Sequence, residues 1–189
     1  MSLSDKLTLS PIRKISGEVI LPGSKSLSNR ILLLSMLAEG QTEIQNLLDS
    51  DDIRRMVEAL EKLGIEFEEN RVENRISVSG TAGIIPVSEA TLMLGNAGTA
   101  IRPLTAAMTL GHGRFVLDGV ARMRERPIID LVEGLSQLGA NLTCLNGTSC
   151  PPVEVIADGL PGGKTRLSGA ISSQYLTAIL LVAPYAKSE

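Results

Sequence analysis

Three apolar stretches along the chain have the length of a buried helix. They are residues 31–38, 104–110 and 176–183. Apolar side chains occupy nearly every position of each stretch, which predicts helices that are buried on all sides rather than lying on a surface. Each stretch follows a turn that consists of a leucine, small residues and then a hydroxyl residue. The three leucines are Leu21, Leu94 and Leu167, and they are 94 − 21 = 73 and 167 − 94 = 73 residues apart.

The segments that follow the first two apolar stretches repeat as well. Residues 40–44 and 113–117 predict strands, and residues 52–63 and 127–138 carry apolar side chains at i, i+3, i+4 and i+7. That spacing predicts amphipathic helices, and Gly64 and Gly139 are placed to end them. Two further strands close each unit. They are predicted at 65–67 and 75–78 in the first unit, and at 141–145 and 153–156 in the second.

The repeat therefore predicts an α/β fold of β-α-β-α-β-β units around buried parallel helices. The first strand of the first unit is expected at 17–21, because these residues alternate, include β-branched side chains and end at Pro22-Gly23. The repeats start near 21, 94 and 167, and the chain ends at Glu189, so we expect 17–189 to be an incomplete three-repeat domain with its third unit truncated. Residues 1–16 have no counterpart in the repeat, and we expect them to pair with a second domain.

The turn before the first buried helix carries the strongest chemical signal. Ser24, Ser26 or Ser28 can cap the helix, whose free backbone N–H groups then favour an anion. Lys25 and Arg30 lie in or near the first turn, where cations oppose the helix dipole. A negatively charged ligand at this point would explain them. The alternative is a solvated pair of charges beside an ordinary cap.

Three equivalent turns around a pseudo-threefold axis would bring three helix N-termini together at one end of the domain. Hydroxyl, amide and cationic side chains on these turns suit a ligand that carries phosphate or carboxylate. The residues concerned are Lys25, Ser26 and Arg30, then Asn96, Gly98, Thr99 and Arg102, then Ser172, Ser173 and Gln174.

Two charged clusters lie outside these turns. Arg122, Arg124 and Arg126 precede the second amphipathic helix, with Pro127 expected at its first position. An arginine here can bind an oxyanion through two N–H groups, and we expect Arg126 to do so, whereas Arg122 and Arg124 are expected to be surface charges paired with Glu125. The acidic cluster at 49–52 is better explained by carboxylates at the start of the next helix than by a metal site.

Composition excludes several functional classes. The net charge is −3, aromatic residues make up 2% and Trp is absent, so nucleic-acid binding is not expected. No apolar run reaches the roughly 20 residues that cross a membrane. Cys144 and Cys150 have no companions for a zinc site and are expected to be reduced thiols of a cytoplasmic protein, and His112 is expected in an exposed loop. Signatures of nucleotide binding are missing, and we expect neither a cofactor nor a metal.

Four motifs in order resemble the EPSP synthase family, the enolpyruvyl transferases of the shikimate pathway of aromatic amino-acid biosynthesis. They are residues 22–30 (PGSKSLSNR), 94–104 (LGNAGTAIRPL), 122–127 (RMRERP) and 169–174 (GAISSQ). The resemblance extends from about Leu7 to the end of the chain. Since the family's enzymes are more than twice this length, it covers their N-terminal portion.

The resemblance implies a metal-free transfer of the enolpyruvyl group of phosphoenolpyruvate to the 5-hydroxyl of shikimate 3-phosphate. By matching motifs, Lys25, Ser26, Arg30, Ser172, Ser173 and Gln174 would bind shikimate 3-phosphate. The phosphoenolpyruvate set would be Lys25, Asn96, Gly98, Thr99, Arg126 and Gln174. Gly98, Thr99 and Pro103 retain the pattern of enzymes that are targets of glyphosate, whereas Ile101 stands where methionine is common.

The resemblance also implies what this chain would need from elsewhere. The family's acid–base carboxylates lie in the second half of its enzymes, so no catalytic residue is expected here. The chain alone would be inactive, and a C-terminal half or complementing chain would be its partner. The related UDP-N-acetylglucosamine enolpyruvyl transferases usually carry a reactive cysteine in the loop where this chain has residues 122–126. The chain therefore resembles those enzymes less. The alternative hypothesis is a stand-alone module that binds anions or a partner without catalysis.

Overall fold

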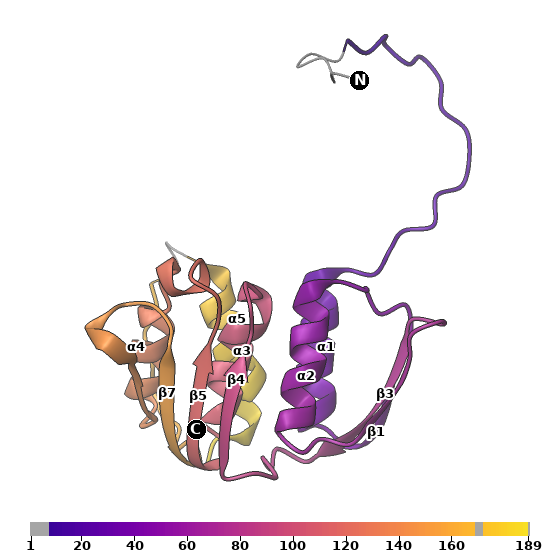
Figure 1. Ribbon diagram of the computed structural model, residues 1–189. Coiled ribbons are helices and arrows are strands. Elements are labelled where there is room, and N and C mark those ends of the chain that lie inside the picture. The colour runs from indigo at the N-terminus through magenta and orange to yellow at the C-terminus, as the bar shows by residue number, and fades with distance from the viewer. Residues whose placement is uncertain (1–7, 169–171, 189) are drawn as a thin grey trace.

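The computed structural model describes residues 8–168 and 172–188 and forms an α/β fold in which most of the helices lie between two sheets (Figure 1). The first unit comprises α1 (Lys25–Leu37), β1 (Glu39–Ile44), α2 (Asp51–Lys62), β2 (Phe67–Asn70) and β3 (Arg75–Thr81). The second comprises β4 (Glu89–Met93), α3 (Gly98–Met108), β5 (His112–Asp118), α4 (Ile129–Gln137), β6 (Asn141–Cys144) and β7 (Val153–Asp158). Helix α5 (Ser173–Val182) belongs to the third. Short 3-10 helices occur at Met123–Glu125, Leu145–Gly147 and Ala183–Tyr185.

The two sheets have the same core topology, as the repeat predicts. The first has the strand order β1-β3-β2 and the second β4-β5-β7-β6. In the first sheet, β3 pairs antiparallel with both β1 and β2. In the second sheet, β7 pairs antiparallel with both β5 and β6 in the same way. Helices α1 and α3 begin at Lys25 and Gly98, which are 98 − 25 = 73 residues apart. The 73-residue repeat is therefore a structural repeat.

The predicted strand at 17–21 is wrong. Strand β4 occupies the corresponding position of the second unit and pairs parallel with β5. Residues 17–21 form no strand, their side chains are exposed, and in Figure 1 the chain runs away from the helices and sheets before α1. Alternating apolar residues become a strand only when a neighbouring strand pairs with their backbone, and no strand in the described part of the chain does so.

The third unit starts as the second does. An isolated parallel bridge joins Gly162 to Ser188. The backbone N–H of Ser188 donates to the carbonyl of Pro161 at 2.9 Å, much as the N–H of Arg114 donates to Ser88 at 2.8 Å where β4 meets β5. This backbone pairing in the described part of the third unit resembles the start of the β4–β5 pairing in the second.

Both amphipathic helices end at the predicted glycines. Gly64 and Gly139 follow α2 and α4 with φ of +74° and +84°, a conformation that only glycine adopts without strain. The N–H groups of Ile65 and Ala140 donate back to Leu60 at 3.0 Å and Leu135 at 3.1 Å. These are Schellman-type ends, so the C-cap prediction is confirmed.

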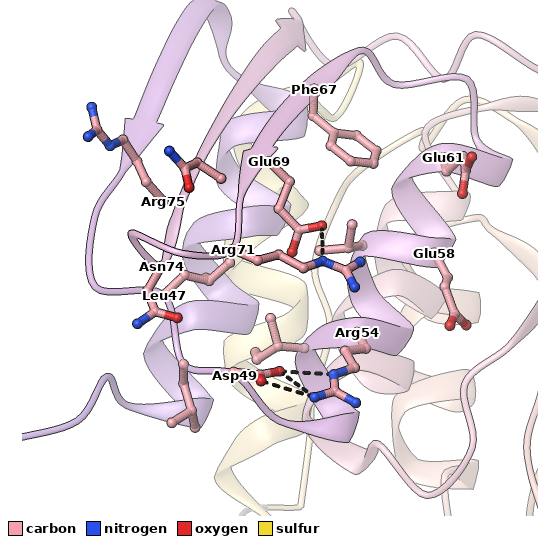
Figure 2. A pocket seen from close by; sticks show the side chains of 14 residues that line it. Leu47, Asp49, Arg54, Glu58, Glu61, Phe67, Glu69, Arg71, Asn74 and Arg75 are labelled. Atoms are coloured by element: carbon pink, nitrogen blue, oxygen red, sulfur yellow. Dashed lines mark hydrogen bonds and ion pairs between the residues drawn. The ribbon is translucent and has the colours of Figure 1, made fainter.

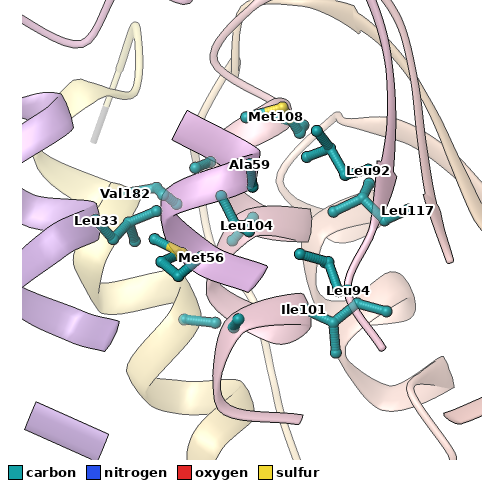
Figure 3. Packing of buried hydrophobic residues seen from close by; sticks show 14 of the residues in the cluster. Leu33, Met56, Ala59, Leu92, Leu94, Ile101, Leu104, Met108, Leu117 and Val182 are labelled. Carbon is teal, nitrogen blue, oxygen red and sulfur yellow. The ribbon is translucent and has the colours of Figure 1, made fainter. Parts of the chain in front are cut away.

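Complete burial is confirmed for only one of the three apolar helices. In α3, 10 of 11 residues are buried, because α1, α5 and the second sheet surround it. Helices α1 and α5 each leave two leucines exposed: Leu27, Leu34, Leu176 and Leu180. Figure 3 shows the centre of the core, where Leu33, Met56, Leu104 and Val182 bring together α1, α2, α3 and α5.

Three further sequence predictions concern single residues. His112 begins strand β5 instead of lying in a loop, although its side chain is exposed and lies 3.0 Å from Asp158. Cys144 and Cys150 are both free thiols. Burial, with a smaller contribution from Cys150, raises the pKa of the Cys144 thiol and so disfavours its thiolate. Among the described helices, none is long and apolar enough to cross a membrane.

Candidate functional site

The N-termini of α1, α3 and α5 converge on one small cavity. Four of the residues that line it were predicted from the sequence, namely Ser26, Arg30, Thr99 and Gln174; Pro103 and Thr177 complete the lining. Each of the three helices contributes two residues. Because the first N–H groups of a helix have no partner within the helix, this arrangement directs three sets of donors toward one region.

Ser24 is the residue that caps α1. Its side chain accepts from the backbone N–H of Leu27 at 3.5 Å, whereas Ser26 and Ser28 lie inside the helix. The first turn of α1 contains no acidic residue. The charge of Lys25 is balanced from the neighbouring helix, since its Nζ lies 3.3 Å from Oδ2 of Asp52 at the start of α2.

Gly98, the first residue of α3, lies against the ends of two arginine side chains. A Cβ there would lie 2.9 Å from Nη1 of Arg102 and 2.9 Å from Nη1 of Arg126, closer than real Cβ atoms come to other atoms. Arg126 donates from the same nitrogen to the carbonyl and the side-chain Oδ1 of Asn96, at 3.2 and 3.3 Å. The absence of a side chain at Gly98 therefore lets two guanidinium groups approach the first turn of α3.

Arg102 links α3 to α5 inside this region. It is only 8% exposed, and its Nη1 donates to the carbonyl of Gly98 at 3.0 Å and to Oε1 of Gln174 at 2.8 Å. The guanidinium also lies 5.5 Å from the centre of the Tyr175 ring. No carboxylate pairs with it in the part of the chain that the structure describes. In α5, the hydroxyl of Ser172 caps the helix by accepting from the N–H of Gln174 at 3.2 Å, and Ser173 is its first residue.

Two residues of this region were not predicted from the sequence. Asp52 was expected only to start a helix, and Asn29 was not considered. Nδ2 of Asn29 donates to Oγ1 of Thr99 at 2.7 Å, and this hydroxyl donates to Oδ2 of Asp52 at 3.2 Å. An acidic residue at a helix N-terminus has a sufficient local explanation, so no sequence pattern indicates these contacts between helices.

A family of known enzymes matches most of this chain in sequence. The family described as EPSP synthase (3-phosphoshikimate 1-carboxyvinyltransferase) matches residues 9–189. The chain belongs to the EPSP synthase family. A solved structure of EPSP synthase from Acinetobacter baumannii superposes with a TM-score of 0.80 and 26% sequence identity, covering 90% of this chain and 39% of that one.

Two curated relatives of the EPSP synthase family are more similar in sequence. The 3-phosphoshikimate 1-carboxyvinyltransferase of Brassica napus, named as chloroplastic, is 60% identical over 97% of this chain. The protein of that name from Shewanella denitrificans is 55% identical over 97% of it. The aligned parts are 37% and 43% of those two proteins, so this chain spans less than half the length of the relatives it matches.

In this EPSP synthase family chain, the predictions for the arginine-rich segment hold in part. Arg122 pairs with Glu125 at 2.6 Å, as expected. Arg124 does not: its Nε and Nη2 donate to the two carboxylate oxygens of Asp118 at 2.9 and 2.5 Å. Helix α4 begins at Ile129, so Pro127 lies before the helix and not at its first position. The carbonyl of Pro127 accepts from the hydroxyl of Tyr175 at 2.7 Å, which ties this segment to α5.

Substituting Asp118 with Asn should make stability less sensitive to acid. Hydrogen bonds from Arg124 chiefly lower the pKa of this carboxyl, and the N–H of Gly119 adds to the effect. A pKa lowered by folding contributes stability that is complete above the unfolded value of about 3.9 and is lost as pH falls toward the folded value. We expect the melting temperature of the wild type to fall more steeply than that of Asp118→Asn below about pH 4. Parallel curves would contradict this assignment.

A larger cavity, about 390 Å³, lies elsewhere, between α2 and the β2–β3 hairpin (Figure 2). None of the predicted site residues lines it. Its arginines are already paired with carboxylates, Arg54 with Asp49 at 2.8 Å, Arg71 with Glu69 at 2.9 Å and Arg75 with Glu43 at 3.7 Å. An anion would have to displace these partners. The converging helices are therefore the candidate functional site of this EPSP synthase family chain.

Proposed function

We propose that this chain supplies one half of a site that transfers the enolpyruvyl group of phosphoenolpyruvate to the 5-hydroxyl of shikimate 3-phosphate, with release of phosphate. The observation that carries the proposal is the convergence of three helix N-termini on Ser26, Arg30, Thr99 and Gln174, in a chain of the EPSP synthase family. The relatives from Brassica napus and Shewanella denitrificans are named for the same carboxyvinyl transfer.

The residue types suit both substrates. Shikimate 3-phosphate would bind to Lys25, Ser26, Arg30, Ser172, Ser173 and Gln174, and phosphoenolpyruvate to Lys25, Asn96, Gly98, Thr99, Arg126 and Gln174. Among the donor nitrogens of Arg126, only Nη1 forms hydrogen bonds with the described residues, and these bonds are long. The other N–H groups of Arg126 are therefore open to an oxyanion. Both substrates carry phosphate, and phosphoenolpyruvate adds a carboxylate, so fixed cations and N–H groups would hold the negative oxygens throughout the reaction.

These groups would act mainly by electrostatic stabilisation. The 5-hydroxyl adds to C2 of phosphoenolpyruvate, an enol phosphate, as its methylene carbon is protonated, and loss of phosphate then gives the product. Charge develops there in a region dense with negative oxygens, and preorganised donors lower that barrier without having to move. Closure of a second half over the substrates would exclude water and align the reacting atoms. Proton transfer would come from that second half, which would be this chain's partner. A cytoplasmic location belongs to the same proposal, whereas the Brassica napus relative is chloroplastic.

Complementation tests the proposal. Residues 1–189 would be mixed with the part of the Shewanella denitrificans relative that lies beyond the aligned region, and phosphate release would be measured with both substrates. We expect no turnover by either part alone and measurable turnover by the mixture. A mixture that contains Lys25→Met should lose this activity, and glyphosate should inhibit the active mixture.

Three outcomes separate the hypotheses. Turnover by residues 1–189 alone would contradict the proposal that this chain supplies only one half of the site. Stabilisation of the chain by shikimate 3-phosphate without turnover in the mixture would favour the alternative, a stand-alone anion-binding module. If shikimate 3-phosphate does not stabilise the chain and the mixture shows no turnover, both the half-site and the anion-binding module are refuted.

A further inference from the structure

One carboxylate oxygen lies where α1, α2 and α3 meet at the edge of the candidate site. Oδ2 of Asp52, in the first turn of α2, lies 3.3 Å from Nζ of Lys25 in α1 and accepts from Oγ1 of Thr99 in α3 at 3.2 Å. Both contacts join residues that are distant in sequence. We propose that Asp52 is a positioning residue that fixes the ammonium group of Lys25 for anion binding. This inference rests on the proposed function, because it assigns a role at the same site.

The side chain of Asp52 is more buried than that of Lys25, as expected if Asp52 positions Lys25 for a ligand. The side chain of Asp52 is 18% exposed, whereas that of Lys25 is 49% exposed. The carboxylate is therefore held within the protein, and the ammonium group reaches solvent where a ligand would approach. A lysine side chain has four flexible carbon atoms, so an unpaired one would occupy many orientations. A single fixed carboxylate restricts it to the side of the site next to α3.

The Thr99 contact keeps the carboxylate itself in place. Thr99 accepts from Nδ2 of Asn29 at 2.7 Å, which leaves its own hydroxyl hydrogen to donate to Asp52. Asn29 is 1% exposed. A buried amide and a hydroxyl in series thus define the direction from which Asp52 receives its hydrogen bond. The network ties the first turns of α1 and α3 to the start of α2.

A simple effect of the α2 dipole does not explain these contacts. Asp51 precedes Asp52 in the same first turn and is close to the same positive end of the α2 dipole. Its side chain is 67% exposed and lies 3.6 Å from Arg55 of its own helix. Asp51 therefore provides the favourable charge at the N-terminus without reaching Lys25. The two adjacent aspartates form a matched pair for experiment.

Asp52 could also oppose a ligand, because its negative charge repels an anion. The two effects predict opposite results for Asp52→Asn. If repulsion dominates, the variant binds shikimate 3-phosphate as tightly as Asp51→Asn or more tightly. If positioning dominates, the variant binds about five- to tenfold more weakly, as expected when one partner of a charge-assisted contact is removed. We expect the weaker binding.

A double-mutant cycle shows whether Asp52 acts through Lys25. Dissociation constants for shikimate 3-phosphate would be measured for the wild type, Asp51→Asn, Asp52→Asn, Lys25→Met and the double variant Lys25→Met/Asp52→Asn, with titrations extended to concentrations that saturate the weakly binding Lys25→Met variants. We expect Asp52→Asn to weaken binding in the wild type and to add less than about a twofold effect in Lys25→Met, because the two side chains are coupled. Equal losses in both backgrounds would overturn the proposal, as would unchanged or tighter binding by Asp52→Asn.

A second measurement is independent of the ligand. The ammonium group of Lys25, identified by its absence in Lys25→Met, should give a protected ¹⁵N-bound proton signal in the wild type and in Asp51→Asn but not in Asp52→Asn. Absence of this signal from the wild type would overturn the proposal. Its presence in a wild type that fails to bind shikimate 3-phosphate would refute the proposed function and still show that Asp52 fixes Lys25.

Discussion

Replacing Lys25 with methionine should remove the stabilisation that shikimate 3-phosphate gives to the protein. At a ligand concentration of about 100 times the dissociation constant, that stabilisation is about 2.7 kcal/mol. Lys25 lies in the first turn of α1, where free N–H groups and the helix dipole already favour an anion. Its ammonium group adds the charge that makes binding of a phosphate strong. Thermal melts with and without shikimate 3-phosphate measure the loss.

The unliganded variant should melt close to the wild type. The sequence alone predicts an equal or higher melting temperature, because a cation at a helix N-terminus is unfavourable by about 0.3–1 kcal/mol. The structure adds an opposing contribution, since Lys25 pairs with Asp52 at 3.3 Å. Half-exposed ion pairs are worth about 0–1 kcal/mol, so the two effects nearly cancel. Arg30→Gln, which removes a second cation from the lining of the same cavity, should show the same combination of results.

Lys62→Met is the matched control. Lys62 ends α2, and its ammonium group donates to the carbonyl of Thr91, away from the converging helices. Its removal should leave the ligand-induced shift unchanged. If Lys25→Met retains the full shift, Lys25 is only a surface charge. If the unliganded Lys25→Met unfolds, Lys25 is a structural cation. Either result would contradict the site proposed here.

Local rules made much of the fold predictable. The spacing of apolar residues and the glycines at 64 and 139 placed α2 and α4 to within two residues at either end. These features depend on residues within one or two turns of each other, and the sequence displays them directly. The starts of α1 and α5 were predictable for the same reason, because a helix that begins after a capping serine, here Ser24 and Ser172, has a local signal.

Several failures depend on contacts that lie outside the local pattern of the sequence. Arg124 was assigned to Glu125, its neighbour, but its donors fit both oxygens of Asp118 at the end of β5. Residues 17–21 have the pattern of a strand without a neighbouring strand in the described structure. The Lys25–Asp52 contact joins two helices whose local sequences each explain one charge. Pattern shows what a segment can become, and tertiary contacts decide which of its possible interactions form.

Leu104→Ala should destabilise the protein by about 2–5 kcal/mol, a large part of the total stability of about 5–15 kcal/mol of a typical domain. Leu104 lies in α3, the helix with 10 of 11 residues buried, and it is fully buried in the shared core (Figure 3). Truncation there removes buried methyl groups and leaves a cavity, because helices on several sides cannot all move inward. Urea unfolding monitored by circular dichroism measures the difference.

Leu180→Ala is the control for this prediction. Leu180 lies in the apolar helix α5 of the third unit, yet its side chain is 61% exposed. The same chemical change should therefore alter stability by less than about 0.5 kcal/mol, as is usual for surface positions. Similar losses for the two variants would show that α5 is as enclosed in solution as α3. That outcome would mean that the face of α5 bearing Leu180 is covered by another surface, and the size of the loss would measure how completely.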